Sequence, residues 1–171
     1  VDFVEISSTG NAVDFGDLAR TEGNFGGFGN FTRAIFGGGE PATNILEYVQ
    51  FASLGNAADF GDLSVARGAV KGNANDTRGL MAGGEEPSLS NVIDFVTINT
   101  LGNAVNFGDL NGSDKRSHGG GASATRGIFG GFGPTAVTDI DYITIQSLGN
   151  AQDFGNLTAT TKHAAACSSV T

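Results

Sequence analysis

The sequence contains very little of several residue types that mark common classes of protein. Cys167 is its one cysteine, only three prolines occur among 171 residues, and tryptophan is absent. A single cysteine excludes an internal disulfide and a multi-cysteine metal site, and we expect Cys167 to be a small buried side chain. No apolar run approaches the roughly 20 residues that span a bilayer, so we predict no membrane insertion.

Basic residues are also scarce. Nine Lys and Arg residues stand against 18 Asp and Glu, which gives a formal net charge of −9. Such an acidic surface repels phosphate backbones, so nucleic acid is not an expected partner. Apolar residues nevertheless make up 39% of the chain and include 13 Phe. This composition is too apolar for a disordered acidic tail, and the length suffices for one domain with a core.

The most prominent feature of the sequence is an internal repeat. The motif Gly-Asn-Ala-x-Asp/Asn-Phe-Gly occurs at residues 10–16, 55–61, 102–108 and 149–155. A second motif begins with Thr-Arg, continues with apolar residues and ends in glycines, at residues 32–39, 77–84 and 125–132. Successive copies lie 45 to 48 residues apart, which is the length of a four-stranded propeller blade.

Each repeat contains four segments with strand character. A stretch of small residues follows a basic residue (Arg20, Arg67, Arg116 or Lys162), and the Thr-Arg motif comes next. A long segment rich in β-branched and aromatic residues then alternates as a half-buried strand does. The Asp-Phe-Gly-Asp-Leu segment predicts a turn followed by a brief strand. Because no segment combines helical periodicity with caps, we predict an all-β fold.

The order of these motifs resembles the Kelch repeat, in which a double glycine closes the second strand. The Kelch tryptophan near the fourth strand is replaced here by Asp-Phe-Gly-Asp-Leu. The whole motif set is more similar to repeats in virion and tail-fibre-like proteins of marine bacteriophages, including those that infect cyanobacteria. This resemblance covers essentially the entire chain and implies a Kelch-like β-propeller in a phage particle.

We predict a single repeat domain over residues 1–171. Its parts are a partial blade 1–19, three blades at 20–66, 67–114 and 115–160, and a partial blade 161–171. These parts contain fifteen expected strands, whereas a closed four-bladed ring has sixteen. We therefore expect the chain to be a section of a larger ring, or to be completed by another chain.

The recurring arginines Arg33, Arg78 and Arg126 are candidate ligand-binding residues. They form a ring in a propeller, and two interpretations remain open: ion pairs with the aspartates of Asp-Phe-Gly-Asp-Leu, or a ring that binds an anion in a central channel. The glycine runs after them have neither the spacing nor the following helix of a phosphate-binding loop. We expect those glycines to be structural, allowing positive φ and close approach of neighbouring blades.

The recurring aspartates and a group of phenylalanines are the other candidates. Asn replaces Asp in some copies, which favours turn capping through backbone hydrogen bonds. The alternative is a metal site, for example for Ca²⁺, on Asp14, Asp17, Asp59 and Asp62. Phe25, Phe28 and Phe31 lie close in sequence and are candidates for stacking on a sugar. His118 and His163 do not recur in register, and we expect ordinary strand or surface positions for both.

No catalytic or cofactor-binding motif is found in the sequence, so we predict neither an enzyme nor a cofactor. The predicted function is a non-catalytic structural or receptor-binding β-propeller module of a phage particle, located in the virion or outside the cell. Expected partners are other virion proteins or further blades of the same parent chain, and a host surface glycan. The alternative is an extracellular lectin-like binding module that does not belong to a virion.

Overall fold

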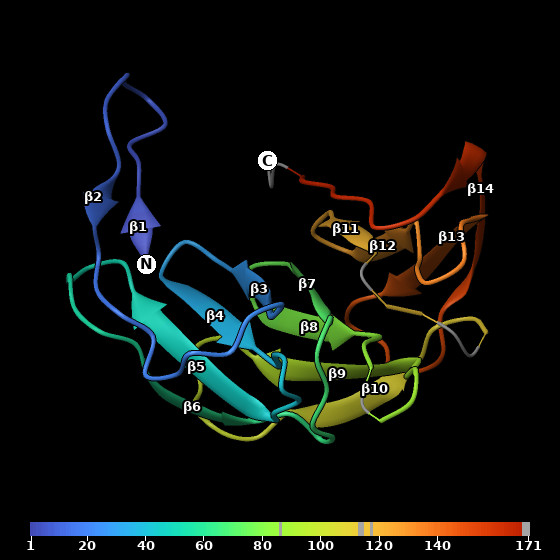
Figure 1. Ribbon diagram of the computed structural model, residues 1–171, viewed down its shortest axis with the longest axis horizontal. Coiled ribbons are helices and arrows are strands. Elements are labelled where there is room, and N and C mark those ends of the chain that lie inside the picture. Colours follow the sequence, from blue (N-terminus) through green and yellow to red (C-terminus); the bar gives the residue numbers. More distant parts are fainter. Residues whose placement is uncertain (86, 113–114, 117, 169–171) are drawn as a thin grey trace.

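The protein is a curved row of antiparallel β-sheets in the computed structural model, which describes residues 1–85, 87–112, 115–116 and 118–168 (Figure 1). Fourteen strands and no helix occur in these residues. They form one two-stranded sheet and three four-stranded sheets. This confirms the predicted all-β class and fits a β-propeller-like fold, although the described chain does not close into a ring (Figure 1).

The strands follow the sequence order within every sheet. The N-terminal hairpin consists of β1 (Asp2–Phe3) and β2 (Val13–Asp14). The first sheet consists of β3 (Gly26–Gly29), β4 (Arg33–Gly37), β5 (Ile45–Gln50) and β6 (Ala58–Asp62). The second consists of β7 (Lys71–Ala74), β8 (Arg78–Ala82), β9 (Val92–Thr97) and β10 (Val105–Asp109). The third consists of β11 (Gly119–Ala122), β12 (Arg126–Gly130), β13 (Val137–Thr144) and β14 (Gln152–Thr161).

The strands of small residues lie where neighbouring sheets approach most closely. β7 contacts both β3 and β11, and these three strands line the inner side of the curve (Figure 1). A methyl group on Gly72 would collide with the Gly27 backbone. Small side chains are therefore needed at these positions, as the sequence predicts.

Two predictions about the strands are wrong. The Asp-Phe-Gly-Asp segments lie inside the fourth strands rather than in turns, because a bulge accommodates the glycine: the register of β10 on β9 shifts between Asn106 and Gly108. The strand predicted after residue 161 is not formed over residues 162–168. That segment runs beside β11 and meets it through a side chain, since the Ala122 N–H donates to the Ser168 hydroxyl at 3.0 Å. Residues 169–171 lie outside the described part.

The apolar core is divided into two clusters, and each one lies between successive sheets. The first cluster joins the first and second sheets through Ile35, Leu46, Phe60, Leu63, Val70, Met81, Val96 and Ile98. The second cluster joins the second and third sheets through Leu80, Ala82, Ile93, Phe107, Leu110, Ala122, Phe129, Phe132, Ile143, Ile145 and Ala151. Burial of these side chains against the next sheet is the main apolar stabilisation of the curve. Over the described ranges, no helix has the length and apolar character to span a membrane.

Candidate functional site

Three of the four Gly-Asn-Ala loops dock on the last strand segment of the preceding unit, in a contact that we call the Gly-Asn-Ala latch. In the second sheet's loop, Gly102 donates its N–H to the Phe60 carbonyl at 2.9 Å, and Ala104 donates to Asp62 at 2.7 Å. The Asp62 N–H in turn donates to the Asn103 side-chain oxygen at 3.1 Å. Residues 55–57 bind residues 15–17, and residues 149–151 bind residues 107–109, in the same way.

Glycine is required on the acceptor strand of the latch. Gly61 has a φ of 144°, and a Cβ atom there would collide with the backbone of Gly102. The recurring Asn serves the latch by accepting a backbone N–H. The Gly-Asn-Ala and Phe-Gly-Asp parts of the repeat are therefore the two halves of one contact between sheets.

Arg33 and Arg78 also connect neighbouring sheets, and all three recurring arginines stack on aromatic rings. Each guanidinium lies over an aromatic ring of the next strand, at 4.8 Å for Arg33 on Tyr48. Arg33 donates to the Ile98 carbonyl of the second sheet at 3.2 Å. Arg78 and Arg126 lie over Phe95 and Tyr142, and Arg78 donates to the Ile145 carbonyl of the third sheet.

The predicted pairing of these arginines with the Asp-Phe-Gly-Asp-Leu aspartates is wrong. β4 pairs with β5 and not with β6, so a whole strand separates Arg33 from those carboxylates and the Tyr48 ring occupies the intervening position. An anion-binding ring stays a prediction, and two of its three members already donate to a carbonyl.

A different set of residues forms the buried ion pairs of the structure. Arg67 and Asp94 are fully buried, with Nη2 2.8 Å from Oδ2. Arg20 and Glu47 form the corresponding pair at 2.9 Å in the first sheet. Such carboxylates recur every 47 residues along the long strands, at Glu47, Asp94 and Asp141. This 47-residue recurrence of carboxylates is visible in the sequence, but the predictions above considered only the longer motifs.

The third repeat uses Lys115 and not Arg116 at the basic position. The Lys115 amine lies 3.9 Å from Asp141 and 3.4 Å from Asp139. Arg116, which the sequence suggested for this role, instead pairs with Glu85 at a half-buried position. Burial raises the pKa of Asp141 to about 6, against the opposing effects of Lys115 and the Asn111 N–H.

Two aspartates of the repeated motif accept a backbone N–H two residues further on, as the capping interpretation predicts, although residues 153–156 lie in β14 and not in a turn. Asp14 accepts the Gly16 N–H at 3.0 Å, and Asp153 accepts the Gly155 N–H at 2.9 Å. Within the described residues no group of three or more His, Cys, Asp or Glu is placed to hold a metal ion. Nothing there favours the alternative site on Asp14, Asp17, Asp59 and Asp62.

The three candidate phenylalanines do not form one aromatic patch. Phe25 packs edge-on against Phe36 and lies beneath Arg20. Phe28 packs against the first core cluster, whereas Phe31 is 77% exposed. Only Phe28 belongs to β3, whereas Phe25 precedes the strand and Phe31 follows it.

Two similar pockets lie one repeat apart at the ends of the long hairpins. One of about 280 Å³ is lined by Tyr142, Ser147 and Leu148 with neighbouring backbone. The other, of about 290 Å³, is lined by Phe95, Thr100 and Leu101. In both, an aromatic ring stacked beneath an arginine forms part of the wall. The leucine that precedes Gly-Asn-Ala lines each pocket, as Leu101 or Leu148, and this recurring position is the sequence signal for the pockets.

Two further residues differ from expectation. His118 is fully buried and contacts the rings of Phe129 and Phe132, so it is not a surface residue. Its Nε2 lies 3.1 Å from the Ala82 carbonyl, and burial lowers its pKa to about 4. Cys167 is exposed rather than buried, because the segment that carries it lies on the surface of β11.

The glycines after the second motif have the structural role that the sequence predicts. Gly83 has a φ of 65°, and the next residue, Gly84, donates its N–H to the Lys115 carbonyl at 2.9 Å. This brings the end of β8 against the start of the next repeat.

No protein-family model and no curated protein matches this sequence.

Proposed function

We propose that this chain is a non-catalytic structural or receptor-binding module of a phage particle, built as a section of a Kelch-like β-propeller. The observation that carries the proposal is that the recurring side chains and loops form contacts between neighbouring sheets. The Gly-Asn-Ala latch occurs three times, and arginines reach across two sheet boundaries. A repeat whose most regular features join one unit to the next suits an assembly part.

Proteomics of purified particles tests this assignment. Trypsin should release residues 127–162 as one peptide, because Arg126 and Lys162 bound a stretch without other Lys or Arg. We expect that peptide in density-purified virions of a phage that carries this gene, at a constant ratio to the capsid protein. Its presence in the infected-cell lysate but not in the particles would contradict the proposal.

The hairpin pockets favour a second candidate function, a lectin-like module outside a virion. Each pocket combines an aromatic wall with hydroxyl and backbone groups, the mixture of surfaces that small-ligand sites use. Two equivalent sites on one rigid chain would bind a repeating glycan with avidity.

A glycan array with matched variants tests the second candidate. Leu101 and Leu148 are more than half exposed in the pockets, so the double variant Leu101→Asp, Leu148→Asp should fold and lose at least about tenfold in glycan binding. Val65→Asp is the control, since Val65 is 49% exposed and lies outside both pockets. Equal binding by both variants, or no binding by the parent chain, would reject the pockets as glycan sites.

A further inference from the structure

The fourth strand of the third sheet carries an empty acceptor half of the Gly-Asn-Ala latch. Gly155 has a φ of 140°, close to the 144° of Gly16 and Gly61, whose acceptor sites are filled. At those two positions an added Cβ would collide with the docked loop, whereas at Gly155 nothing lies within 4 Å among the described residues. The acceptor backbone is therefore preformed without its loop.

The side chains around this acceptor are exposed only in the third sheet. Phe154 is 53% exposed, whereas its counterparts Phe60 and Phe107 are 2% and 3% exposed. Ile128 is 38% exposed, and its counterpart Ile35 is fully buried. Phe154 still packs edge-on against Tyr142, with ring centroids 5.9 Å apart. The ring is in place, and the apolar surface that covers it elsewhere is missing. We call the exposed surface of the third sheet around Ile128, Phe154 and Gly155 the end face.

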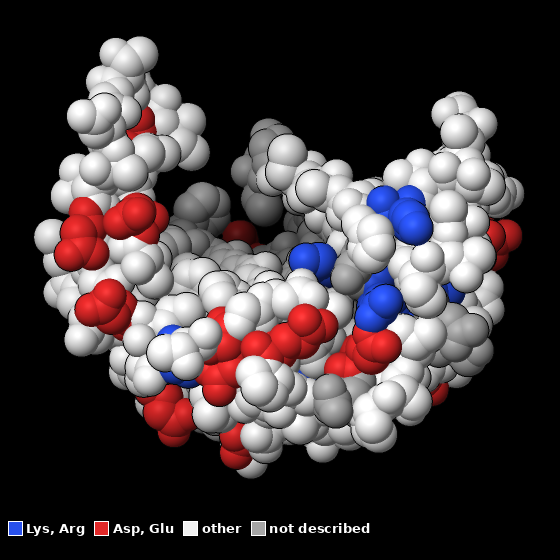
Figure 2. Space-filling model, in the orientation of Figure 1, with Lys and Arg blue, Asp and Glu red and all other residues white. Residues whose placement is uncertain are grey.

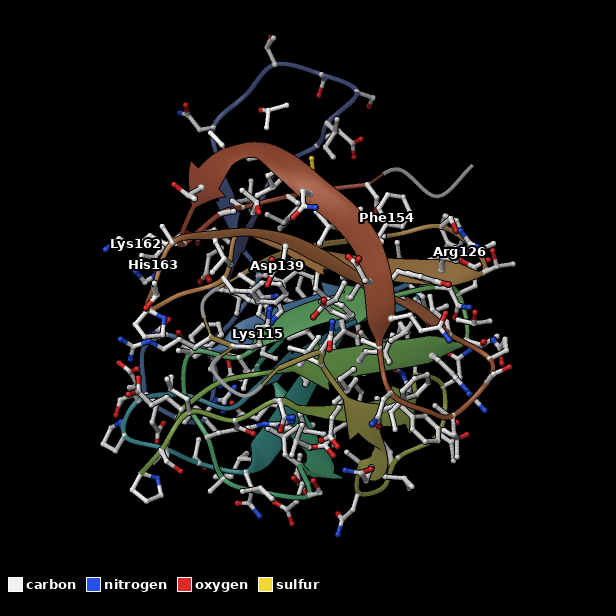
Figure 3. The ribbon with its side chains drawn as sticks, turned by 90° about the vertical axis from the view of Figure 1, so that its right-hand side faces the viewer. Lys115, Arg126, Asp139, Phe154, Lys162 and His163 are labelled. Atoms are coloured by element: carbon white, nitrogen blue, oxygen red, sulfur yellow. The ribbon has the colours of Figure 1, made fainter. Side chains whose placement is uncertain are left out.

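A mainly apolar depression of about 170 Å³ lies on the same end face. It is lined by Ile128, Ile140, Leu157 and residues 164–166, among others. In the two internal interfaces, a large side chain of the next sheet's second strand, Met81 or Phe129, packs into the corresponding core cluster. Arg126, near Phe154 in Figure 3, is exposed, whereas Arg33 and Arg78 each donate to a carbonyl of the following sheet.

The N-terminal hairpin carries the matching donor half. Val4 and Ile6 are 57% and 95% exposed, while Val96 and Ile98, at the same repeat position, are 5% and 0% exposed. The first Gly-Asn-Ala loop, residues 10–12, has no acceptor strand in the described chain. Its Gly10 lacks the φ near 150° that Gly55, Gly102 and Gly149 adopt when docked.

Charge and position also separate the two ends. Residues 1–19 contain four Asp or Glu residues and no Lys or Arg. On the face shown in Figure 2, acidic side chains lie over the hairpin and the first two sheets, and Lys and Arg gather toward the third sheet. A hollow separates the hairpin from the third sheet in the same view, so the matching surfaces of one chain stand apart.

We propose that the N-terminal hairpin of a second copy of this chain docks on the end face. Residues 10–12 of one copy latch onto residues 154–156 of the other, the Ile6 carbonyl accepts the Arg126 guanidinium, and Ile6 covers Phe154. The contact continues an interface that the chain forms three times internally. It joins different surfaces of the two copies, so it generates open rows or closed rings. The inference deepens the proposed assembly role and rests on it.

Sedimentation of two complementary variants tests the proposal. Ile6→Asp disables the donor and Phe154→Asp disables the acceptor, and both side chains are exposed enough for the folds to persist. We expect the unchanged chain to associate with rising concentration between about 1 μM and 1 mM, where modest interfaces dissociate. Each variant alone should stay monomeric, and their mixture should give a 1:1 dimer that grows no further. Val65→Asp should associate as the unchanged chain does.

Several outcomes would overturn the inference. An unchanged chain that stays monomeric at every concentration would exclude a second copy as the occupant of the end face. Association that survives in both single variants would place the contact elsewhere, and a mixture that stays monomeric would reject the pairing of these two ends. Thermal unfolding of each variant establishes that the fold is retained. None of these results bears on whether the chain occurs in virions, which the particle proteomics decides separately.

Discussion

At the scale of single residues, two buried titratable groups respond to pH in opposite directions. His118 lies among aromatic rings, and burial lowers its pKa from 6.5 to about 4. Asp141 is buried on β13, and burial raises its pKa from 3.8 to about 6. The folded chain therefore resists protonation of the first group and favours protonation of the second.

We predict that these effects partly cancel between pH 6 and pH 4. In this range the unfolded chain protonates His118 and the folded chain does not, so acidification removes up to roughly 3 kcal/mol of stability. The folded chain protonates Asp141 and the unfolded chain does not, so acidification adds stability. Asp141→Asn abolishes only the second effect.

The stability of Asp141→Asn relative to the unchanged chain should therefore fall as the pH is lowered from 6 to 4. Urea denaturation at several pH values measures it. His118→Asn serves as the opposite control, because its relative stability should rise over the same range. Parallel pH profiles for all three proteins would contradict the assignment.

Sequence reasoning located the charged residues better than their partners. It identified Arg20 and Arg67 as recurring basic positions, and the structure buries both against carboxylates of the long strands. For Arg33 it offered the aspartates of Asp-Phe-Gly-Asp-Leu as partners. Two sets of opposite charges that recur with the same period suggest ion pairs when the strand order within the sheet is unknown. The 47-residue recurrence of Glu47, Asp94 and Asp141 falls within apolar segments and is easily read as strand alternation.

At the scale of elements, the latch explains why the fourth strands contain glycine. Gly61 and Gly155 have φ values of 144° and 140°, so alanine costs similar backbone strain at both. They differ in that only Gly61 has a loop docked against it. The pair separates the cost of the backbone conformation from the cost of losing the latch.

We predict that Gly61→Ala destabilises the chain by at least about 2 kcal/mol more than Gly155→Ala. The added methyl group at 61 displaces the Gly102 backbone and breaks its hydrogen bonds, whereas that at 155 enters open space. Denaturation at low protein concentration, where copies remain separate, measures the difference. Equal destabilisation by the two substitutions would show that the latch contributes nothing.

The second and third strands of each sheet could be predicted from the sequence because their alternation and terminal glycines are strong local signals. The start of the fourth strand could not, since Asp-Phe-Gly-Asp has the composition of a turn and becomes part of the strand only through the bulge. The segment after residue 161 is rich in small residues, as are β7 and β11. Those strands form because β8 and β12 pair with them, and composition alone does not supply that partner.

At the scale of the whole molecule, the period of the sequence predicts the number and order of the four-stranded sheets. It cannot predict which surfaces stay exposed, because every copy of the repeat carries the same apolar pattern. Phe60 and Phe154 occupy identical positions in their motifs and differ in exposure from 2% to 53%. Only the position of a unit in the row decides this.

Stability should follow the same position dependence. The second sheet is covered on both faces by core clusters, whereas the third is covered on one. In a row of repeats each unit is held mainly by its neighbours, and segments with fewer buried contacts open at lower free energy. We predict that backbone amides of β8 and β9 exchange slowest, and that those of β12 and β13 exchange at least about tenfold faster in dilute solution.

Hydrogen exchange at two protein concentrations completes this prediction. If copies join through the end face, raising the concentration should slow exchange in β12 and β14 and leave β8 and β9 unchanged, because only the end face gains a cover. The Phe154→Asp variant should show the dilute pattern at both concentrations. Uniform protection across the three sheets would mean that the chain unfolds as one cooperative unit, and the end face would then have no separate influence on its stability.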